Sequence, residues 1–146
     1  MEQKFGSAKE MQEYAAECVK ALAPKGDGAT VLALNGELGA GKTTFTQGAA
    51  RVLGVTDPVI SPTFLIERVY DLENQKFEKF VHIDAYRFES AEELAKLGWD
   101  DIVADPRNLI IVEWAEKVVE KIPKSALWLQ FEHMKGEGRV LKQIER

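Results

Sequence analysis

The chain is poor in cysteine, in long apolar segments and in positive charge, and each shortage excludes a class of protein. Its single cysteine, Cys18, cannot form an intrachain disulfide. No apolar stretch approaches the roughly 18 residues that a membrane-spanning helix needs. The first residues, Met1 to Ser7, contain no apolar core of a secretion signal. We therefore expect a cytoplasmic protein without membrane contact.

Composition and charge narrow the class further. The net charge of −5 at pH 7 argues against a broad nucleic-acid-binding surface, although it leaves room for a small basic patch. With 45% hydrophobic and 29% charged residues, the composition is ordinary for a globular protein. A length of 146 residues is enough for one hydrophobic core. We expect residues 1–146 to form a single domain, with Cys18 buried on an apolar helical stripe.

Glycine occurs in one informative arrangement. Residues 36–43 match the phosphate-binding pattern G-x-x-x-x-G-K-[ST], in the order Gly36, Glu37, Leu38, Gly39, Ala40, Gly41, Lys42 and Thr43. The glycines let the backbone turn tightly, so that its N–H groups point at phosphate oxygens. Lys42 can reach the β- and γ-phosphates, and the Thr43 hydroxyl can ligate the Mg²⁺ that bridges them. The pattern predicts a nucleoside triphosphate site.

The sequence around the glycine loop supports this interpretation. Residues 30–34, Thr-Val-Leu-Ala-Leu, read as a buried strand, and residues 42–53 read as a helix that Gly54 ends. Strand, loop and helix follow one another as the motif requires. The helix N-terminus would add partial positive charge at the phosphates. A glycine-rich turn without a ligand is the structural alternative.

The remaining patterns predict an α/β fold. A Ser7 cap with Glu10 opens a helix to about Ala23, and residues 64–70 and 77–83 resemble an antiparallel hairpin. Further helices are expected at 90–97 and 114–121, and further strands at 109–112, 126–131 and 139–144. We predict a three-layer sandwich like that of P-loop NTPases. Its mixed sheet would have a parallel centre and antiparallel portions from the hairpin and the C-terminal strands.

Two carboxylates follow predicted strands. Asp84 comes after Phe80-Val-His-Ile83, and Glu113 comes after residues 109–112. Ligands of open α/β sheets collect at the carboxyl ends of the strands, so both side chains should face the glycine loop. One carboxylate would hold Mg²⁺, directly or through water, and the other would orient an attacking water molecule. A helix cap or a surface ion pair is the structural alternative for each.

Each of four other features has two possible interpretations. Residues 61–63, Ser-Pro-Thr, suit a loop that senses a γ-phosphate or a simple proline turn. Arg87 can stabilise transferred charge or lie in solvent. Trp114 suits the core or the wall of a nucleotide pocket. His82 lies inside a predicted strand, which favours a packed or supporting residue over a general base.

Missing motifs limit the kind of nucleotide chemistry. The chain lacks Asn-Lys-x-Asp, which disfavours a GTPase, and Leu-Ser-Gly-Gly-Gln, which disfavours a transport ATPase. Three hypotheses remain. The chain is an ATPase, a small-molecule kinase with Asp84 as the base and Arg87 on the acceptor, or a binding module that a nucleotide switches.

Four segments together resemble the TsaE (YjeE) family. They are residues 36–45, Ser-Pro-Thr-Phe at 61–64, His-Ile-Asp-Ala-Tyr-Arg at 82–87 and Val-Glu-Trp at 112–114. The resemblance covers nearly the whole chain. It implies a P-loop ATPase, weak on its own, that is needed for threonylcarbamoyladenosine modification of tRNAs reading codons that begin with A. It also implies ATP and Mg²⁺ as cofactors, TsaD and TsaB as partners, and tRNA contact only through that complex.

The resemblance also implies the roles of individual residues. It assigns Lys42, Asp84 and Glu113 to catalysis, and Thr43 and Glu113 to Mg²⁺. Nucleotide contacts would come from the glycine loop with Lys42 and Thr43, and from Thr44, Thr63, Trp114, Ser7 and Arg139. Ser7 and Arg139 match as single residues rather than as parts of longer motifs. The family often has Asp where this chain has Glu37, an exchange of one acidic residue for another that should not disturb the loop.

Overall fold

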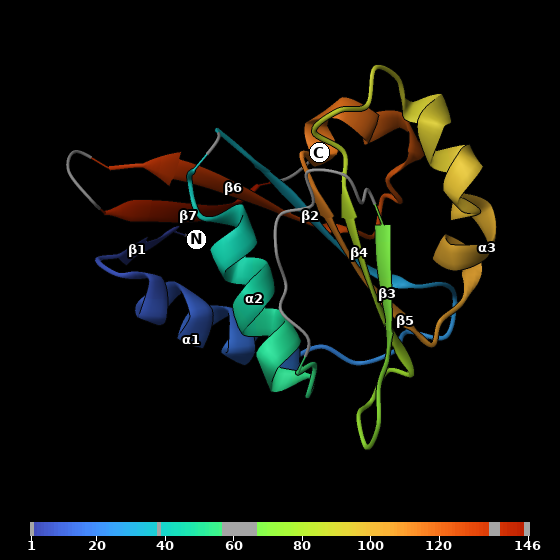
Figure 1. Cartoon of the computed structure of the whole chain (residues 1–146), viewed down its shortest axis with the longest axis horizontal. Helices are drawn as coiled ribbons and strands as arrows, with labels where there is room; N and C mark the ends of the chain where they lie inside the picture. Colours follow the sequence, from blue (N-terminus) through green and yellow to red (C-terminus); the bar gives the residue numbers. More distant parts are fainter. Residues whose placement is uncertain (1, 38, 57–66, 135–137, 145–146) are drawn as a thin grey trace.

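The described strands form one sheet with the order β1-β7-β6-β2-β5-β4-β3 (Figure 1). The computed structural model describes residues 2–37, 39–56, 67–134 and 138–144. The strands are β1 (Glu2–Phe5), β2 (Thr30–Gly36), β3 (Glu67–Asp71), β4 (Lys79–Asp84), β5 (Asn108–Glu113), β6 (Leu127–His133) and β7 (Arg139–Ile144). The predicted strand start at 64–66 and residues 135–137 lie outside the described residues.

The sheet is parallel at its centre and antiparallel toward both edges. β2 pairs in parallel with β5 and with β6, and β4 pairs in parallel with β5. β3 is antiparallel to β4, β7 is antiparallel to β6, and β1 is antiparallel to β7. This arrangement confirms the predicted mixed sheet, with the hairpin at one side and the C-terminal strands at the other.

Helices cover both faces of the sheet (Figure 1). They are α1 (Ala8–Lys20), α2 (Lys42–Val52), the 3₁₀ helix η1 (Ala91–Leu97), α3 (Trp99–Ala104) and the 3₁₀ helix η2 (Ala115–Lys121). Leu32 and Leu34 of β2 pack into the apolar cluster under α1 and α2. Val31 and Ala33 pack into the cluster under the other helices. Because successive strand residues point to opposite faces, β2 is buried on both sides, as expected for a central parallel strand.

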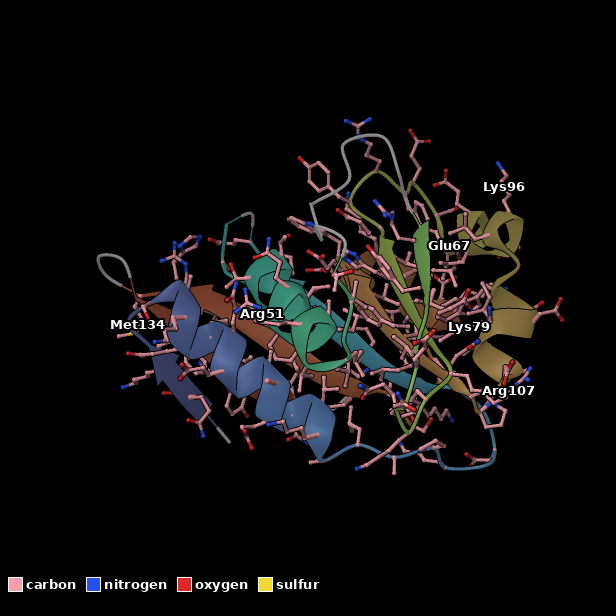
Figure 2. The ribbon with its side chains drawn as sticks, turned by 60° about the horizontal axis from the view of Figure 1, so that its bottom comes forward. Arg51, Glu67, Lys79, Lys96, Arg107 and Met134 are labelled. Carbon is pink, nitrogen blue, oxygen red and sulfur yellow. The ribbon has the colours of Figure 1, made fainter. Side chains whose placement is uncertain are left out.

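Charged side chains lie on the outer surfaces of the helices. Lys96 on η1 and Arg51 on α2 are both exposed, and Figure 2 shows Lys96 extending away from the body of the protein. None of the described helices has the length and apolarity of a membrane span.

Several details of the helices and strands differ from the sequence predictions. The segments at 91–97 and 115–121 are 3₁₀ helices rather than α-helices, as is common for short connectors. The first helix was predicted to reach about Ala23 but ends at Lys20, where the backbone N–H of Leu22 bonds to the carbonyl of Val19. β1 and α3 were not predicted, because four to six residues are too few for a clear periodic pattern.

Close packing of α1 against α2 fixes the helix that follows the glycine loop. A Cβ atom on Gly48 of α2 would lie only 2.4 Å from the backbone oxygen of Gln12 in α1. The Gln12 side-chain amide also donates a hydrogen bond to Gln47 Oε1 at 3.2 Å. Only glycine lets the two backbones approach this closely. The middle of α2 is therefore held closely against α1.

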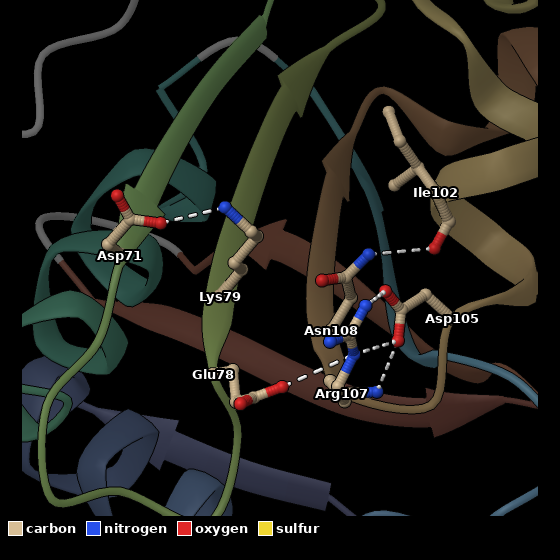
Figure 3. Close-up of polar contacts among 7 residues, drawn as sticks. All are labelled: Asp71, Glu78, Lys79, Ile102, Asp105, Arg107 and Asn108. Carbon is tan, nitrogen blue, oxygen red and sulfur yellow. Dashed lines mark hydrogen bonds and ion pairs between the residues drawn. The ribbon is translucent and has the colours of Figure 1, made fainter.

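Ion pairs lie where the parallel strands β4 and β5 begin and where β3 ends (Figure 3). Arg107 contacts Asp105 at 2.8 Å and Glu78 at 3.2 Å, while Lys79 contacts Asp71 at 2.8 Å. The hydrogen bonds from Arg107 lower the pKa of the Asp105 carboxyl to about 2. Exposed pairs of this kind contribute little to stability. Because these residues contribute little to stability and lie away from the carboxyl ends of the strands, they are suitable positions for control substitutions.

Candidate functional site

Gly36 and Gly41, at the two ends of the glycine loop, have backbone conformations that favour glycine. Gly36 has a φ of 140°, and a Cβ atom there would lie 2.4 Å from the backbone oxygen of Phe131. Gly41 has a φ of 111° and precedes α2 without supplying a side-chain cap. The first N–H groups of a helix have no partner within the helix, and this end has no cap to satisfy them. The start of α2 therefore offers N–H donors and partial positive charge to an anion.

Lys42 lies at the centre of this loop. Its Nζ donates hydrogen bonds to the backbone oxygens of Gly36, at 2.5 Å, and Glu37, at 2.9 Å. The same atom lies 4.2 Å from the centre of the Trp114 ring, within cation–π range. Burial lowers the pKa of the Lys42 ammonium group, and the negative charge of nearby carboxylates, Glu116 first, opposes that effect. The loop thus holds a desolvated cation where an anionic ligand would approach.

The two predicted carboxylates lie side by side beyond the loop. Asp84 and Glu113 are direct neighbours in the pairing of β4 with β5, and both are buried. Glu113 Oε1 accepts a hydrogen bond from the Thr43 hydroxyl at 3.1 Å, and its Oε2 is within hydrogen-bond distance of His82 Nε2. Asp84 Oδ1 accepts from the backbone N–H of Tyr86 at 2.9 Å. Glu113 is therefore joined directly to the glycine loop.

The donor set suits a magnesium–triphosphate pair. Thr43 and Glu113 offer a hydroxyl and a carboxylate, which are the hard oxygen ligands that Mg²⁺ prefers. In the described part of the chain, no group of three or more His, Cys, Asp or Glu side chains could hold a metal ion. Magnesium in phosphate-transfer sites usually takes only one or two protein ligands and completes its shell with phosphates and water. The residues present fit this mode of binding.

A pocket of about 130 Å³ opens beside the loop. Its polar lining comes from Ser7 at the start of α1, Thr44 of α2, Arg139 of β7 and the loop glycines Gly39 and Gly41. Phe5, Ala8 and Met11 supply the apolar part of the lining. The Arg139 guanidinium donates to the backbone oxygen of Gly39 at 3.0 Å. Two candidates from opposite ends of the chain, Ser7 and Arg139, are thus brought to the same side of the glycine loop.

Trp114 has an unusual backbone conformation next to Glu113. It precedes η2 with a φ of 58°, in the left-handed region that few residues other than glycine adopt. Its ring lies 5.0 Å from that of Tyr86, and the Lys117 ammonium lies 5.0 Å from the Tyr86 ring. The predicted helix start at Trp114 is therefore off by one residue. The Trp114 ring lies against Lys42, and this half-buried side chain also packs against the apolar cluster that includes Val31 and Ala33.

Glu116 was missed by the sequence analysis. Its Oε2 accepts a hydrogen bond from the backbone N–H of Gly36 at 3.3 Å, so that η2 is attached to the first residue of the glycine loop. The sequence feature that could have indicated Glu116 is its position one helical turn after Glu113. Two other predicted contacts, Leu38 and Thr63, lie outside the described residues, as do Ser61 and Pro62.

Comparisons with known proteins agree with one another. A family model described as "Threonylcarbamoyl adenosine biosynthesis protein TsaE" matches residues 5–141. The tRNA threonylcarbamoyladenosine biosynthesis protein TsaE of Bacillus subtilis is 42% identical over 126 residues, covering 86% of this chain and 74% of the relative. The TsaE protein of Borreliella burgdorferi is 38% identical over 112 residues, covering 77% and 79%.

A solved structure resembles this one over almost its whole length. The crystal structure of YdiB from Bacillus subtilis superposes with a TM-score of 0.78 at 29% sequence identity. The match covers 98% of this chain and 83% of the solved chain. The α/β architecture with its mixed sheet is thus shared with a known protein.

Proposed function

The chain belongs to the TsaE family of threonylcarbamoyl adenosine biosynthesis proteins, and from this membership we propose that it binds ATP with Mg²⁺ and hydrolyses the ATP. Its family places it in the biosynthesis of threonylcarbamoyladenosine in tRNA. One observation carries the ATPase proposal. The Thr43 hydroxyl contacts the buried Glu113 carboxylate at 3.1 Å, directly beside Lys42 in a glycine loop that opens an uncapped helix.

Lys42, Thr43 and Glu113 would act on the phosphates. The Lys42 ammonium would exchange the backbone oxygens of Gly36 and Glu37 for phosphate oxygens, while N–H groups at the start of α2 bind the same phosphates. Thr43 and Glu113 would hold Mg²⁺, which when bound neutralises negative charge on the phosphates. Asp84 would accept a hydrogen bond from the attacking water and so orient it.

The pocket beside the loop would take the nucleoside. Ser7 and Arg139 offer hydrogen-bond donors at its rim, and Phe5 and Met11 offer apolar surface for a base. Thr44 also lines this pocket and would contact the phosphates from there. Trp114 would pack near the γ-phosphate through its contact with Lys42. Leu38 and Thr63 would also contact the nucleotide, as their positions in the sequence motifs imply.

We further propose that TsaD and TsaB are the partners and that tRNA is contacted only through their complex. The test is gel filtration of the purified chain mixed with a TsaB–TsaD pair, with ATP, with ADP and without nucleotide. We expect a complex that forms with ATP and weakens with ADP, because hydrolysis removes the γ-phosphate that the site holds. If the chain binds ATP in calorimetry but never elutes with the pair, the partner proposal is wrong.

A further inference from the structure

His82 is a buried polar residue that the proposed phosphate chemistry does not itself use. It lies in the middle of β4 and is only 2% exposed. Its ring is nearly parallel to that of Phe80, with 6.5 Å between the centroids. Its Nε2 atom is within hydrogen-bond distance of Glu113 Oε2. A buried imidazole needs such a partner, because an unpaired polar group inside a protein costs free energy.

The two strands fix this contact. His82 pairs with Ile111 in the register of β4 with β5, and Asp84, two residues later, pairs with Glu113. Residues two apart point to the same face of a sheet, so His82, Asp84 and Glu113 share one face. An ionised carboxylate can only accept hydrogen bonds, so the proton of this contact belongs on His82 Nε2. The Glu113 carboxylate is then held from both sides, by His82 and by Thr43.

We propose that His82 is a positioning residue for Glu113, an inference that rests on the proposed binding of ATP with Mg²⁺. By donating to Oε2, His82 stops rotation of the carboxylate and keeps Oε1 facing the Thr43 hydroxyl. Those two oxygens are the proposed ligands of Mg²⁺. Residues that hold metal ligands in place through hydrogen bonds commonly change metal affinity on the order of 10- to 100-fold when they are replaced.

The experiment compares His82→Phe with His82→Gln. Phenylalanine keeps a flat ring next to Phe80 but removes the donor, whereas glutamine keeps an N–H donor. ATP affinity is measured by calorimetry in Mg²⁺ and in EDTA for both variants and the wild type. We expect His82→Phe to lose on the order of tenfold or more in Mg²⁺ and to match the wild type in EDTA. His82→Gln should recover most of the loss.

Each other outcome has a distinct meaning. Wild-type affinities of His82→Phe in both Mg²⁺ and EDTA would overturn the inference and leave ATP binding intact. An equal loss in Mg²⁺ and in EDTA would make His82 a purely structural residue, which also overturns it. If the wild type does not bind ATP under either condition, the proposed function itself fails.

A second measurement decides the matter if His82→Phe does not fold, as judged by circular dichroism. Nitrogen-15 NMR of the wild-type histidines reports which ring nitrogen carries a proton. We expect a protonated, slowly exchanging Nε2 for His82, with a shift that changes on addition of Mg²⁺ to the ATP-bound protein. An unprotonated Nε2, or a signal that ignores Mg²⁺, would contradict the inference.

Discussion

Replacing Lys42 with methionine is expected to weaken ATP binding by on the order of 100-fold. Lys42 is buried, and its ammonium group is already held in the glycine loop by the backbone oxygens of Gly36 and Glu37. A hydrogen bond to a charged group contributes about 1.5–3 kcal/mol, and about 1.4 kcal/mol corresponds to a tenfold change in affinity. Two lost contacts with phosphate oxygens, each at the lower end of that range, cost about 3 kcal/mol together and so give the expected reduction. Methionine keeps the apolar stem, so packing against Trp114 should largely remain.

Calorimetric titration with ATP measures this loss. The matched control is Arg51→Gln, which removes a cation from the exposed last turn of the same helix, away from the loop. The control should bind ATP like the wild type. A melting curve of Lys42→Met separates lost binding from lost folding. An ATP affinity equal to that of the wild type in folded Lys42→Met would refute the role of Lys42.

Replacing Asp84 with asparagine is expected to slow ATP hydrolysis by on the order of tenfold or more while ATP binding persists. Asp84 Oδ1 accepts the backbone N–H of Tyr86, and asparagine has an oxygen at the same place. The loop after β4 should therefore stay folded. The variant removes the negative charge that would orient and activate the attacking water. Asp84→Ala removes both the negative charge and the oxygen that accepts the Tyr86 N–H. The difference in rate between the two variants therefore measures the contribution of that hydrogen bond.

Single-turnover hydrolysis with saturating ATP measures the effect of Asp84→Asn. Asp71→Asn is the matched control, because Asp71 also ends a strand but is exposed and pairs only with Lys79 among the contacts described above. The control should hydrolyse ATP at the wild-type rate. Unchanged turnover in Asp84→Asn would remove Asp84 from the chemical step and leave its contact with Tyr86 as its role.

Local sequence patterns were enough to predict the glycine loop and its surroundings. A buried strand, a loop and a helix follow one another within residues 30–52, so no long-range contact was needed to recognise them. Asp84 and Glu113 were also predictable as a pair. Both end strands of a parallel sheet, and the ends of such strands meet at one edge. The structure places them directly opposite each other in β4 and β5.

Contacts that depend on the order of strands in the sheet could not be predicted from the sequence. Nothing in the local pattern says that β4 lies next to β5, so the contact of His82 with Glu113 could not be derived. The contact of Glu116 with Gly36 depends on the left-handed turn at Trp114, which is rare for a residue other than glycine. Ser7 and Arg139 were matched only by family resemblance, because their closeness requires β1 to pair with β7.

ATP hydrolysis by the chain, alone and with a TsaB–TsaD pair, tests the central claim most directly. The rate of phosphate release would be measured for the wild type and for Asp84→Asn under both conditions. We expect weak hydrolysis by the chain alone, strong stimulation by the pair, and little stimulation of Asp84→Asn. A wild-type rate that stays weak with the pair present, although calorimetry shows ATP bound, would contradict the claim.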